Sequence, residues 1–170
     1  MKAKYIFTVS MLALMSVALF AQNAENKVNS QGKKEGFWKK YDDKGVLLYE
    51  GTFNNGVPVG TFKYYHANGK LKSTTNFIQG THKVHTILFD QNEKLAAEGD
   101  FVDQLKDGEW IYYSEKGTTI KTENYKIGKK HGDFKTFSAE TGLLLEVCHY
   151  DNYHSDSIPN LMDYYKHRLH

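Results

Sequence analysis

The sequence has a single cysteine, Cys148, and almost no net charge apart from its first residues. One cysteine cannot form an internal disulfide, so stability has to come from packing and sheet hydrogen bonds. The formal charge of +2 comes entirely from Lys2 and Lys4, because removing them leaves 20 basic residues against 20 acidic ones. This balance argues against electrostatic capture of nucleic acid or of an anionic membrane.

The motifs of common active sites are also missing. The sequence contains no Gly-x-Ser-x-Gly, no phosphate-binding glycine loop and no His-Glu-x-x-His. Acid–base catalysis needs at least two convergent titratable groups. Acidic residues such as Glu50 and Glu98 instead recur at repeat positions, which is typical of a solvated sheet face. We therefore expect a protein that is not an enzyme and that uses no cofactor.

Histidines are present, but their spacing fits no metal signature, since a metal site needs three or four ligands in a fixed arrangement. Of the eight histidines, two lie in the third repeat unit and four gather toward the C-terminus: His82, His85, His149, His154, His167 and His170. We interpret them as surface residues and expect no metal site. A hydrolase that uses the C-terminal histidines is the minor alternative.

Only one long apolar run exists, and it lies at the N-terminus. Lys2 and Lys4 precede an apolar stretch over residues 5–20, and the small residue Ala21 is followed by polar sequence. This order is typical of a secretory signal. We expect cleavage after Ala21, with residues 1–21 as signal peptide and a periplasmic or extracellular location for the mature protein. The alternative is an uncleaved membrane anchor.

The mature chain repeats with a period of 24 residues, which is typical of stacked repeat architectures. A marker glycine recurs, followed by one aromatic residue five positions later and a second one seventeen positions later. The markers are Gly36, Gly60, Gly108 and Gly132, with Val84 at the missing step.

Each unit reads as two short strands rich in aromatic and β-branched residues, separated by glycine-containing turns. Short connections imply antiparallel neighbours, so we predict a meander of about ten strands. In the second strand of a unit, Tyr49, Gly51 and Phe53 share one face. In the first strand, Tyr113 falls on the face opposite to Trp110, which indicates either two covered faces or a bulge.

The third unit is degenerate, because Val84, Thr86 and Glu93 replace the marker glycine, an aromatic residue and a turn glycine. We expect a distorted hairpin near residues 91–94. After the last unit, residues 154–170 contain a proline followed by apolar residues at helical spacing. We predict a short C-terminal capping helix there; a partner-binding helix is the alternative. Residues 22–31 are expected to form a flexible leader.

The pattern Gly-x-Trp-x-x-Tyr, then Gly-x-Leu, then Tyr or Phe-x-x-Gly-x-x-x-Gly resembles the MORN repeat, and more closely its bacterial 24-residue variant. The resemblance covers residues 32–153. It implies an all-β fold, an elongated antiparallel β-meander of five hairpin repeats. It further implies a surface for protein contacts, with lipid binding proposed for some members. Much of the bacterial group is labelled antitoxin-like, after an intracellular immunity protein, whereas this chain carries an export signal.

One aromatic ladder is the candidate contact surface, since exposed aromatic stripes bind proteins or stack on sugars. Its members are Trp38, Phe62, Trp110 and Phe134. Packing between strands is the competing interpretation. The leading functional hypothesis is an exported, non-catalytic scaffold that binds one protein partner. The alternatives are an immunity protein that neutralises a toxin and an envelope glycan or lipid binder. Open sheet edges would also allow a homodimer.

Overall fold

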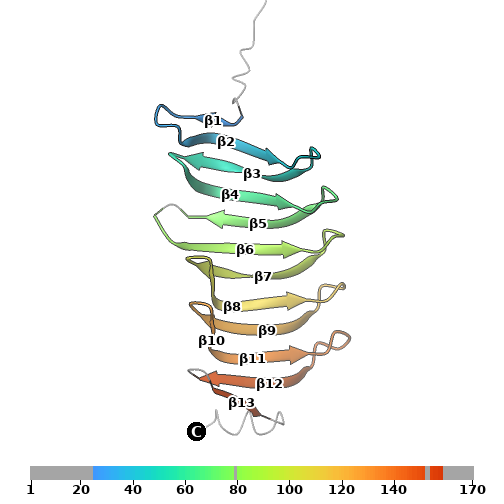
Figure 1. The fold of residues 1–170 in the computed structure, drawn as a ribbon. Coiled ribbons are helices and arrows are strands. Elements are labelled where there is room, and N and C mark those ends of the chain that lie inside the picture. Colours follow the sequence, from blue (N-terminus) through green and yellow to red (C-terminus); the bar gives the residue numbers. More distant parts are fainter. Residues whose placement is uncertain (1–24, 79, 152–153, 159–170) are drawn as a thin grey trace, which may run out of the picture.

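The computed structural model describes residues 25–78, 80–151 and the backbone of 154–158. These residues form a single elongated sheet, in which consecutive strands lie side by side and hairpin loops project from both sides (Figure 1). The strands are β1 (Lys27–Val28), β2 (Lys34–Tyr41), β3 (Leu47–Asn54), β4 (Val57–Tyr65), β5 (Leu71–Phe77), β6 (Lys83–Phe89), β7 (Leu95–Val102), β8 (Leu105–Tyr113), β9 (Thr119–Lys126), β10 (Lys129–Lys130), β11 (Gly132–Phe137), β12 (Leu144–Asp151) and β13 (His154–Ile158).

Every neighbouring pair of strands is antiparallel, and the order in the sheet follows the order in the chain. The exception is β10, a two-residue strand that pairs with β9 just before the chain continues into β11. This arrangement confirms the predicted all-β antiparallel meander of hairpin repeats. In the part of the chain that is described, no helix is long and apolar enough to cross a membrane.

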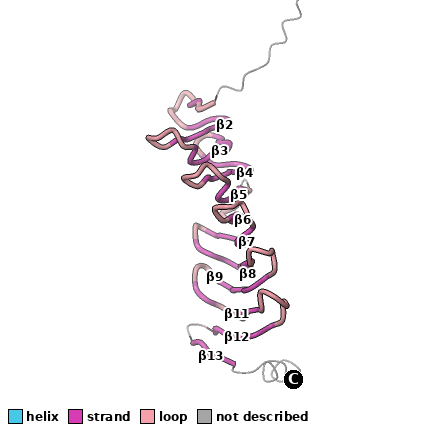
Figure 2. Tube along the Cα trace, turned by 90° about the vertical axis from the view of Figure 1, so that its right-hand side faces the viewer, coloured by secondary structure: helices cyan, strands magenta, loops and turns pink. Residues whose placement is uncertain are grey.

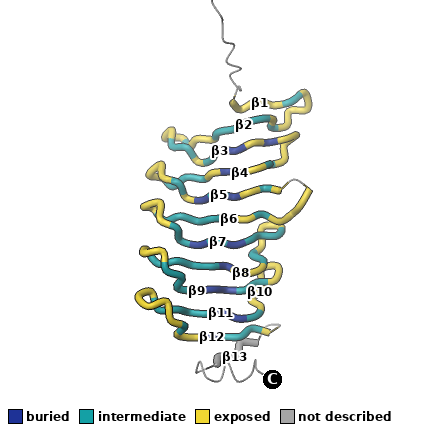
Figure 3. The backbone as a smooth tube through the Cα atoms, turned by 180° about the vertical axis from the view of Figure 1, so that it is seen from behind, coloured by how far each residue is buried: buried dark blue, intermediate teal, exposed yellow. Residues whose placement is uncertain are grey.

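The two faces of the sheet differ in character. On the face that we call the core face, Trp38 lies opposite Gly51, and Trp110 lies opposite Glu123. The face opposite to it, which we call the polar face, carries cross-strand neighbours such as Lys39 and Glu50. Buried residues gather in the middle of the strands, and exposed residues gather at the hairpin loops (Figure 3). The sheet therefore builds its core from one face without a second layer.

The marker glycines bend the strands. Gly60 and Gly108 have φ angles of +68° and +74°, which side chains other than glycine rarely adopt. At each of these positions the pairing with the preceding strand skips residues, between Glu50 and Thr52 and between Glu98 and Asp100. In the units that have a marker glycine, this bend folds the start of the first strand toward the core face, and Figure 2 shows the resulting curvature from the side.

The degenerate unit lacks this bend. Val84 has no positive φ angle, and β5 pairs with β6 without any register shift. The predicted distortion near residues 91–94 is wrong. Asp90 N donates to Lys94 O at 2.9 Å, as Asp42 N donates to Val46 O in the first unit. Glu93 adopts the left-handed conformation, with φ +63°, at the place where other turns use glycine.

The irregular connection of this unit lies elsewhere. Strand β5 ends at Phe77 and β6 begins only at Lys83, whereas two-residue turns join the strands at the corresponding places of the neighbouring units. In those turns both central residues have positive φ, as at Asn55 and Gly56. This geometry is that of the type I′ turn, which matches strand twist.

The two ends of the array differ from expectation. Residues 25–31, within the expected flexible leader, form β1 and a turn, and Asn26 covers the edge of β2 by accepting from Lys39 N at 2.8 Å. At the other end, residues 154–158, which we assigned to the tail, form β13 on β12. The signal peptide and the predicted C-terminal helix over the remaining tail lie outside the described residues.

Candidate functional site

The four aromatic residues predicted as a contact surface all lie on the core face. Phe62 and Trp110 are 2% and 1% exposed, Phe134 is also buried, and Trp38 is partly exposed. Their rings pack on neighbouring aromatic residues, for example Phe62 on Phe53 at 5.1 Å between centroids. As a contact surface they remain a prediction, but three of the four rings leave almost no area for a partner.

For Phe62 and Trp110, burial follows from contact with a glycine on the preceding strand. A Cβ atom added to Gly51 would lie 2.5 Å from the ring of Phe62, and one added to Gly99 would lie 2.5 Å from Trp110. Each ring therefore lies flat against bare backbone, a known way to stabilise glycine within a sheet. The indole of Trp110 also donates from Nε1 to Asp100 O at 3.0 Å.

Lysine side chains cover these aromatic clusters. Lys34, Lys106 and Lys130 occupy the same repeat position, at the start of the bent segment. The Nζ of Lys106 lies 4.4 Å from the ring centroid of Trp110, 5.2 Å from Tyr112 and 5.0 Å from Tyr125. Such cation–π contacts stabilise an ammonium group over a ring face.

The other two lysines have similar surroundings. Lys34 Nζ lies 4.7 Å from the centroid of Trp38 and 4.6 Å from that of Phe53. Lys130 Nζ lies 4.6 Å from the centroid of Tyr150. Sequence reasoning missed these cages, although the copied sequences Gly-Lys-Lys at residues 32–34 and 128–130 were the available signal.

A buried carboxylate completes the cage of Lys106. Glu123 stands where the other units have glycine, threonine or cysteine, and its side chain is 10% exposed. It accepts from Tyr112 Oη at 2.6 Å and from Tyr125 Oη at 2.8 Å, and it pairs with Lys121 Nζ at 2.5 Å. Burial opposes its ionisation, but the hydrogen bonds from Lys121 and the two tyrosines prevail and lower the pKa of Glu123 to about 2.

On the polar face, tyrosine–glutamate hydrogen bonds link alternate pairs of repeats. Tyr65 Oη donates to Glu50 at 2.8 Å, and Tyr113 Oη donates to Glu98. Burial is the larger cause at Tyr65 and the glutamate hydrogen bond is the larger one at Tyr113, and each pKa rises to about 12. At the two intervening boundaries, phenylalanine replaces the tyrosine and threonine replaces the glutamate, at Phe89 with Thr74 and at Phe137 with Thr122.

The same contacts answer the question that the sequence left open about Tyr113. A register shift occurs between Tyr112 and Tyr113, so a bulge is present. Tyr113 nevertheless reaches Glu98, whose strand neighbour Ile111 lies on the polar face. The bulge is therefore present, and Tyr113 lies on the polar face, opposite to the face of Trp110.

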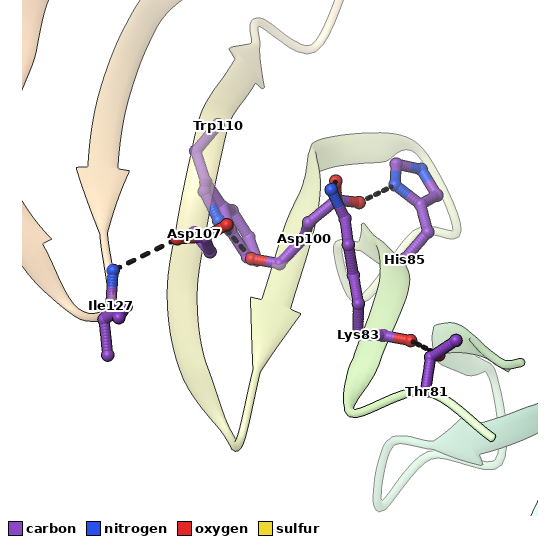
Figure 4. A network of polar contacts seen from close by, with 7 residues as sticks. All are labelled: Thr81, Lys83, His85, Asp100, Asp107, Trp110 and Ile127. Carbon is purple, nitrogen blue, oxygen red and sulfur yellow. Dashed lines mark hydrogen bonds and ion pairs between the residues drawn. The ribbon is translucent and has the colours of Figure 1, made fainter.

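A polar cluster marks the degenerate unit on the same face (Figure 4). Asp100 accepts from Lys83 Nζ at 2.8 Å, and its other oxygen lies 2.8 Å from His85 Nδ1. The opposite ring nitrogen of His85 lies 3.6 Å from Glu98. Burial opposes the ionisation of Asp100, but Lys83 and His85 outweigh it and lower the pKa of the carboxyl.

A second histidine–aspartate pair lies two repeats farther along, with the two residue types exchanged. His149 Nδ1 lies 2.8 Å from Asp133, which is 8% exposed. Beside it is a shallow depression of about 400 Å³, lined among others by Asn124, His131 and Lys135. Among the residues whose side chains are described, no group of three or more histidine, cysteine, aspartate or glutamate residues could hold a metal ion.

The fold and these surfaces define a class, an open array of β-hairpin repeats with a one-sided aromatic core. Residues 34–55 and 58–79 match the family model described as the MORN repeat variant. These segments are the first two hairpin units, so these two units match the MORN repeat variant. Repeats of this family are modules that bind proteins or lipids. The chain matches no curated protein.

Two solved structures resemble part of the chain. TarM is 14% identical with a TM-score of 0.45, and the match covers 65% of this chain and 22% of TarM. A TarM mutant from S. aureus, in complex with Fondaparinux, alpha-GlcNAc-glycerol and UDP, is 12% identical with a TM-score of 0.46, over 79% and 24% of the two chains. The chain spans less than a quarter of the length of these proteins, and the likeness is too distant to bear on function.

Proposed function

We propose that the protein is an exported, non-catalytic interaction module that binds one protein partner. The observation that carries this proposal is that recurrent residues build the core, whereas residues that vary between units form charged clusters. The recurrent aromatic residues, such as Phe62 and Trp110, are buried in the core. The residues that vary between units, such as His85 and Glu123, supply charged clusters that the other units fold without.

Several features support a binding role over catalysis. The sequence lacks the motifs of common active sites, and the charged clusters are saturated with internal partners, as Glu123 is by tyrosines and a lysine. A long sheet with differing side chains along its length suits recognition of an extended protein surface. The N-terminal run over residues 5–20 supports export to the periplasm or the exterior.

The test is reciprocal capture. Residues 22–170 with a C-terminal tag are incubated with native envelope and secreted fractions, and each captured protein is then tagged and used to recover the untagged module. We expect one protein to pass both directions and to co-elute with the module as a stable complex. Failure of every captured protein in the reverse direction would contradict the proposal. The identity of the partner also tests the immunity hypothesis, which requires a toxin.

Export is tested separately by expressing residues 1–170 and measuring the intact mass of the protein in each cell fraction. We expect the periplasmic or secreted form to begin at Gln22. A full-length protein that stays in the cytoplasm would contradict this part. Sedimentation with liposomes and a glycan array test the lipid- and glycan-binding alternative.

A further inference from the structure

We propose that the Lys34–Tyr49 and Lys130–Tyr150 pairs bind carboxylate groups of an acidic segment of the partner. The inference rests on the proposed function and adds the chemistry of the contact. It starts from the caged lysines, whose ammonium groups are held over aromatic rings at fixed positions along the array.

The fourth unit shows what a caged lysine takes as its counter-ion. Lys106 Nζ donates to Tyr112 Oη at 2.5 Å, and Tyr112 Oη in turn donates to Glu123 at 2.6 Å. The ammonium group also lies 3.7 Å from the same carboxylate. Lysine, tyrosine and carboxylate thus form a continuous chain of charge-assisted hydrogen bonds that ends on the carboxylate.

In the first unit the corresponding chain of hydrogen bonds has no carboxylate at its end among the described residues. Lys34 Nζ donates to Tyr49 Oη at 2.7 Å, but no acceptor for the tyrosine hydroxyl and no carboxylate for Lys34 is found among the described residues. The position of Glu123 is taken by Gly51, which has no side chain and is covered by Phe62. Both Lys34 and Tyr49 are partly exposed, so a group from outside can reach them.

The last unit also has a lysine–tyrosine pair, although its tyrosine comes from a different repeat position than Tyr49. Lys130 Nζ donates to Tyr150 Oη at 3.2 Å. Tyr150 occupies the position of Tyr125, which donates to Glu123, whereas Cys148 stands where the carboxylate would be. Within the described part of the chain, neither Lys130 nor the hydroxyl of Tyr150 contacts a carboxylate. An ammonium group has three N–H donors, so each of the two pairs keeps donors for an external anion.

The spacing of the two pairs defines the ligand further. Lys34 is the first residue of β2. Lys130 is the last residue of β10, shortly before β11, and β11 lies eight strand steps from β2 in the sheet. At about 4.8 Å per step, the separation is about 38 Å. An extended segment of about 12 residues covers that length. A flexible acidic segment of this length or more can engage both pairs at once, which raises affinity through effective concentration.

The experiment titrates residues 22–170 with fluorescently labelled poly-L-glutamate of about 30 residues, and follows anisotropy at low and at physiological salt. The test variant is Lys34→Met with Lys130→Met, because an unbranched apolar side chain still covers the rings. The charge-matched control is Lys72→Met with Lys116→Met, two exposed lysines that have no polar side-chain contact among the described residues. A third variant, Tyr49→Phe with Tyr150→Phe, keeps the rings and removes only the hydroxyls.

We expect the Lys34/Lys130 variant to weaken binding at least tenfold, the tyrosine variant to weaken it severalfold, and the control to change it less than twofold. Equal losses in test and control variants would overturn the inference, because they would reflect net charge alone. Absence of wild-type binding would also overturn it. Tighter binding of inorganic polyphosphate, lost in the same variant, would overturn the assignment to carboxylates.

The binding experiment with poly-L-glutamate and the capture experiment for the proposed function can fail independently of each other. A captured protein partner whose affinity is unchanged in the Lys34/Lys130 variant would overturn only this inference. Poly-L-glutamate binding that depends on both pairs, combined with no reciprocal protein capture, would contradict only the proposed function. The far-ultraviolet circular dichroism and the melting temperature of each variant establish that it is folded before binding is compared.

Discussion

The boundary between β7 and β8 and the boundary between β5 and β6 occupy equivalent places in the array, but they are built differently. At the first, Trp110 lies against Gly99, and β8 bends at Gly108. At the second, Thr86 stands in place of the aromatic residue and Thr75 in place of the glycine, and β6 runs straight. The two threonine hydroxyls are 3.0 Å apart and buried.

The comparison shows that the ring and the glycine are one structural unit. At β3–β4 and β7–β8 a large ring lies on the bare backbone of a glycine, and at β5–β6 the threonine at the glycine position faces a small partner. Both positions changed together in the degenerate unit, so its backbone pairing stayed intact. The ring contacts that run from Trp38 through Phe53 and Phe62 end at Phe77 and resume at Phe101, among the described residues. This gap makes the β5–β6 boundary the weaker one.

Truncation of the Trp110 ring should have the largest effect on stability. Trp110→Ala removes a side chain that is 1% exposed, and we expect a loss of about 3–5 kcal/mol in the free energy of unfolding. Thr86→Ala at the equivalent position should cost less, because it removes far fewer atoms. Chemical denaturation of both variants measures the difference. Equal losses would contradict the stronger role that we assign to the ring.

Adding a methyl group beneath the ring should come next in size. Gly99→Ala places a Cβ atom 2.5 Å from the indole of Trp110, and overpacking of this kind costs about 1–3 kcal/mol. The combination Gly99→Ala with Trp110→Thr should recover part of the loss expected from the two single changes, because it imitates the degenerate boundary. Thermal melts of the four proteins in this cycle provide the coupling energy, and strict additivity would count against a single unit.

The buried threonine pair of the β5–β6 boundary is tested by removing its hydroxyl groups. Thr86→Val leaves the buried hydroxyl of Thr75 without its partner, and we expect a loss of about 1–3 kcal/mol. Replacing both threonines by valine should be nearly neutral, since no polar group is then stranded. The free energies of unfolding of the two single variants and the double variant check this. A double variant as unstable as the sum of the singles would refute it.

The stabilisation that Glu123 provides should depend on pH. Its pKa falls from 4.5 to about 2 in the folded protein, so the unfolded chain binds its proton more readily. The stabilisation is therefore complete above about pH 4.5 and is lost as the pH falls toward about 2. We expect Glu123→Gln to lower the melting temperature at pH 6 and to have little effect at pH 2. The exposed Glu109→Gln serves as control, and a pH-independent difference for Glu123→Gln would contradict the prediction.

The smallest expected effect concerns Thr122. Among the described residues its buried hydroxyl has no hydrogen-bond partner, because Phe137 stands where Tyr113 donates to Glu98. Thr122→Val removes the unsatisfied group at equal shape, so we expect unchanged or slightly higher stability. Thr74→Val at the other phenylalanine boundary is the matched comparison. A clear loss of melting temperature in Thr122→Val would show that the hydroxyl has a partner.

Repetition made much of the fold predictable. The period placed the hairpins, and the alternation in Tyr49, Gly51 and Phe53 identified the core face, because such patterns depend only on neighbouring residues. The turn at residues 91–94 was misjudged, since backbone hydrogen bonds and an Asp90 side chain hold Glu93 in a glycine-like conformation. Strand β13 was missed because residues 154–158 were assigned to the C-terminal tail, although the helical spacing begins only after Pro159.

The candidate contact residues show where sequence reasoning stops. The ladder of Trp38, Phe62, Trp110 and Phe134 was visible from spacing, but its burial depends on the bends at the marker glycines. The cages of Lys34, Lys106 and Lys130 depend on the same bends, which bring the start of a strand over rings farther along it. The shared repeat position of these lysines was visible in the sequence, but their placement over aromatic rings is visible only in the folded structure.

Amide hydrogen exchange along the array tests the comparison most directly. Residues 22–170 are followed by mass spectrometry under native conditions, and the opening free energy is compared between β5–β6 and β7–β8. We predict faster exchange at β5–β6, with the segments 34–77 and 95–151 each opening as a more stable unit. Slower or equal exchange at β5–β6 relative to β7–β8 would contradict the claim that rings packed on glycine hold the repeats together.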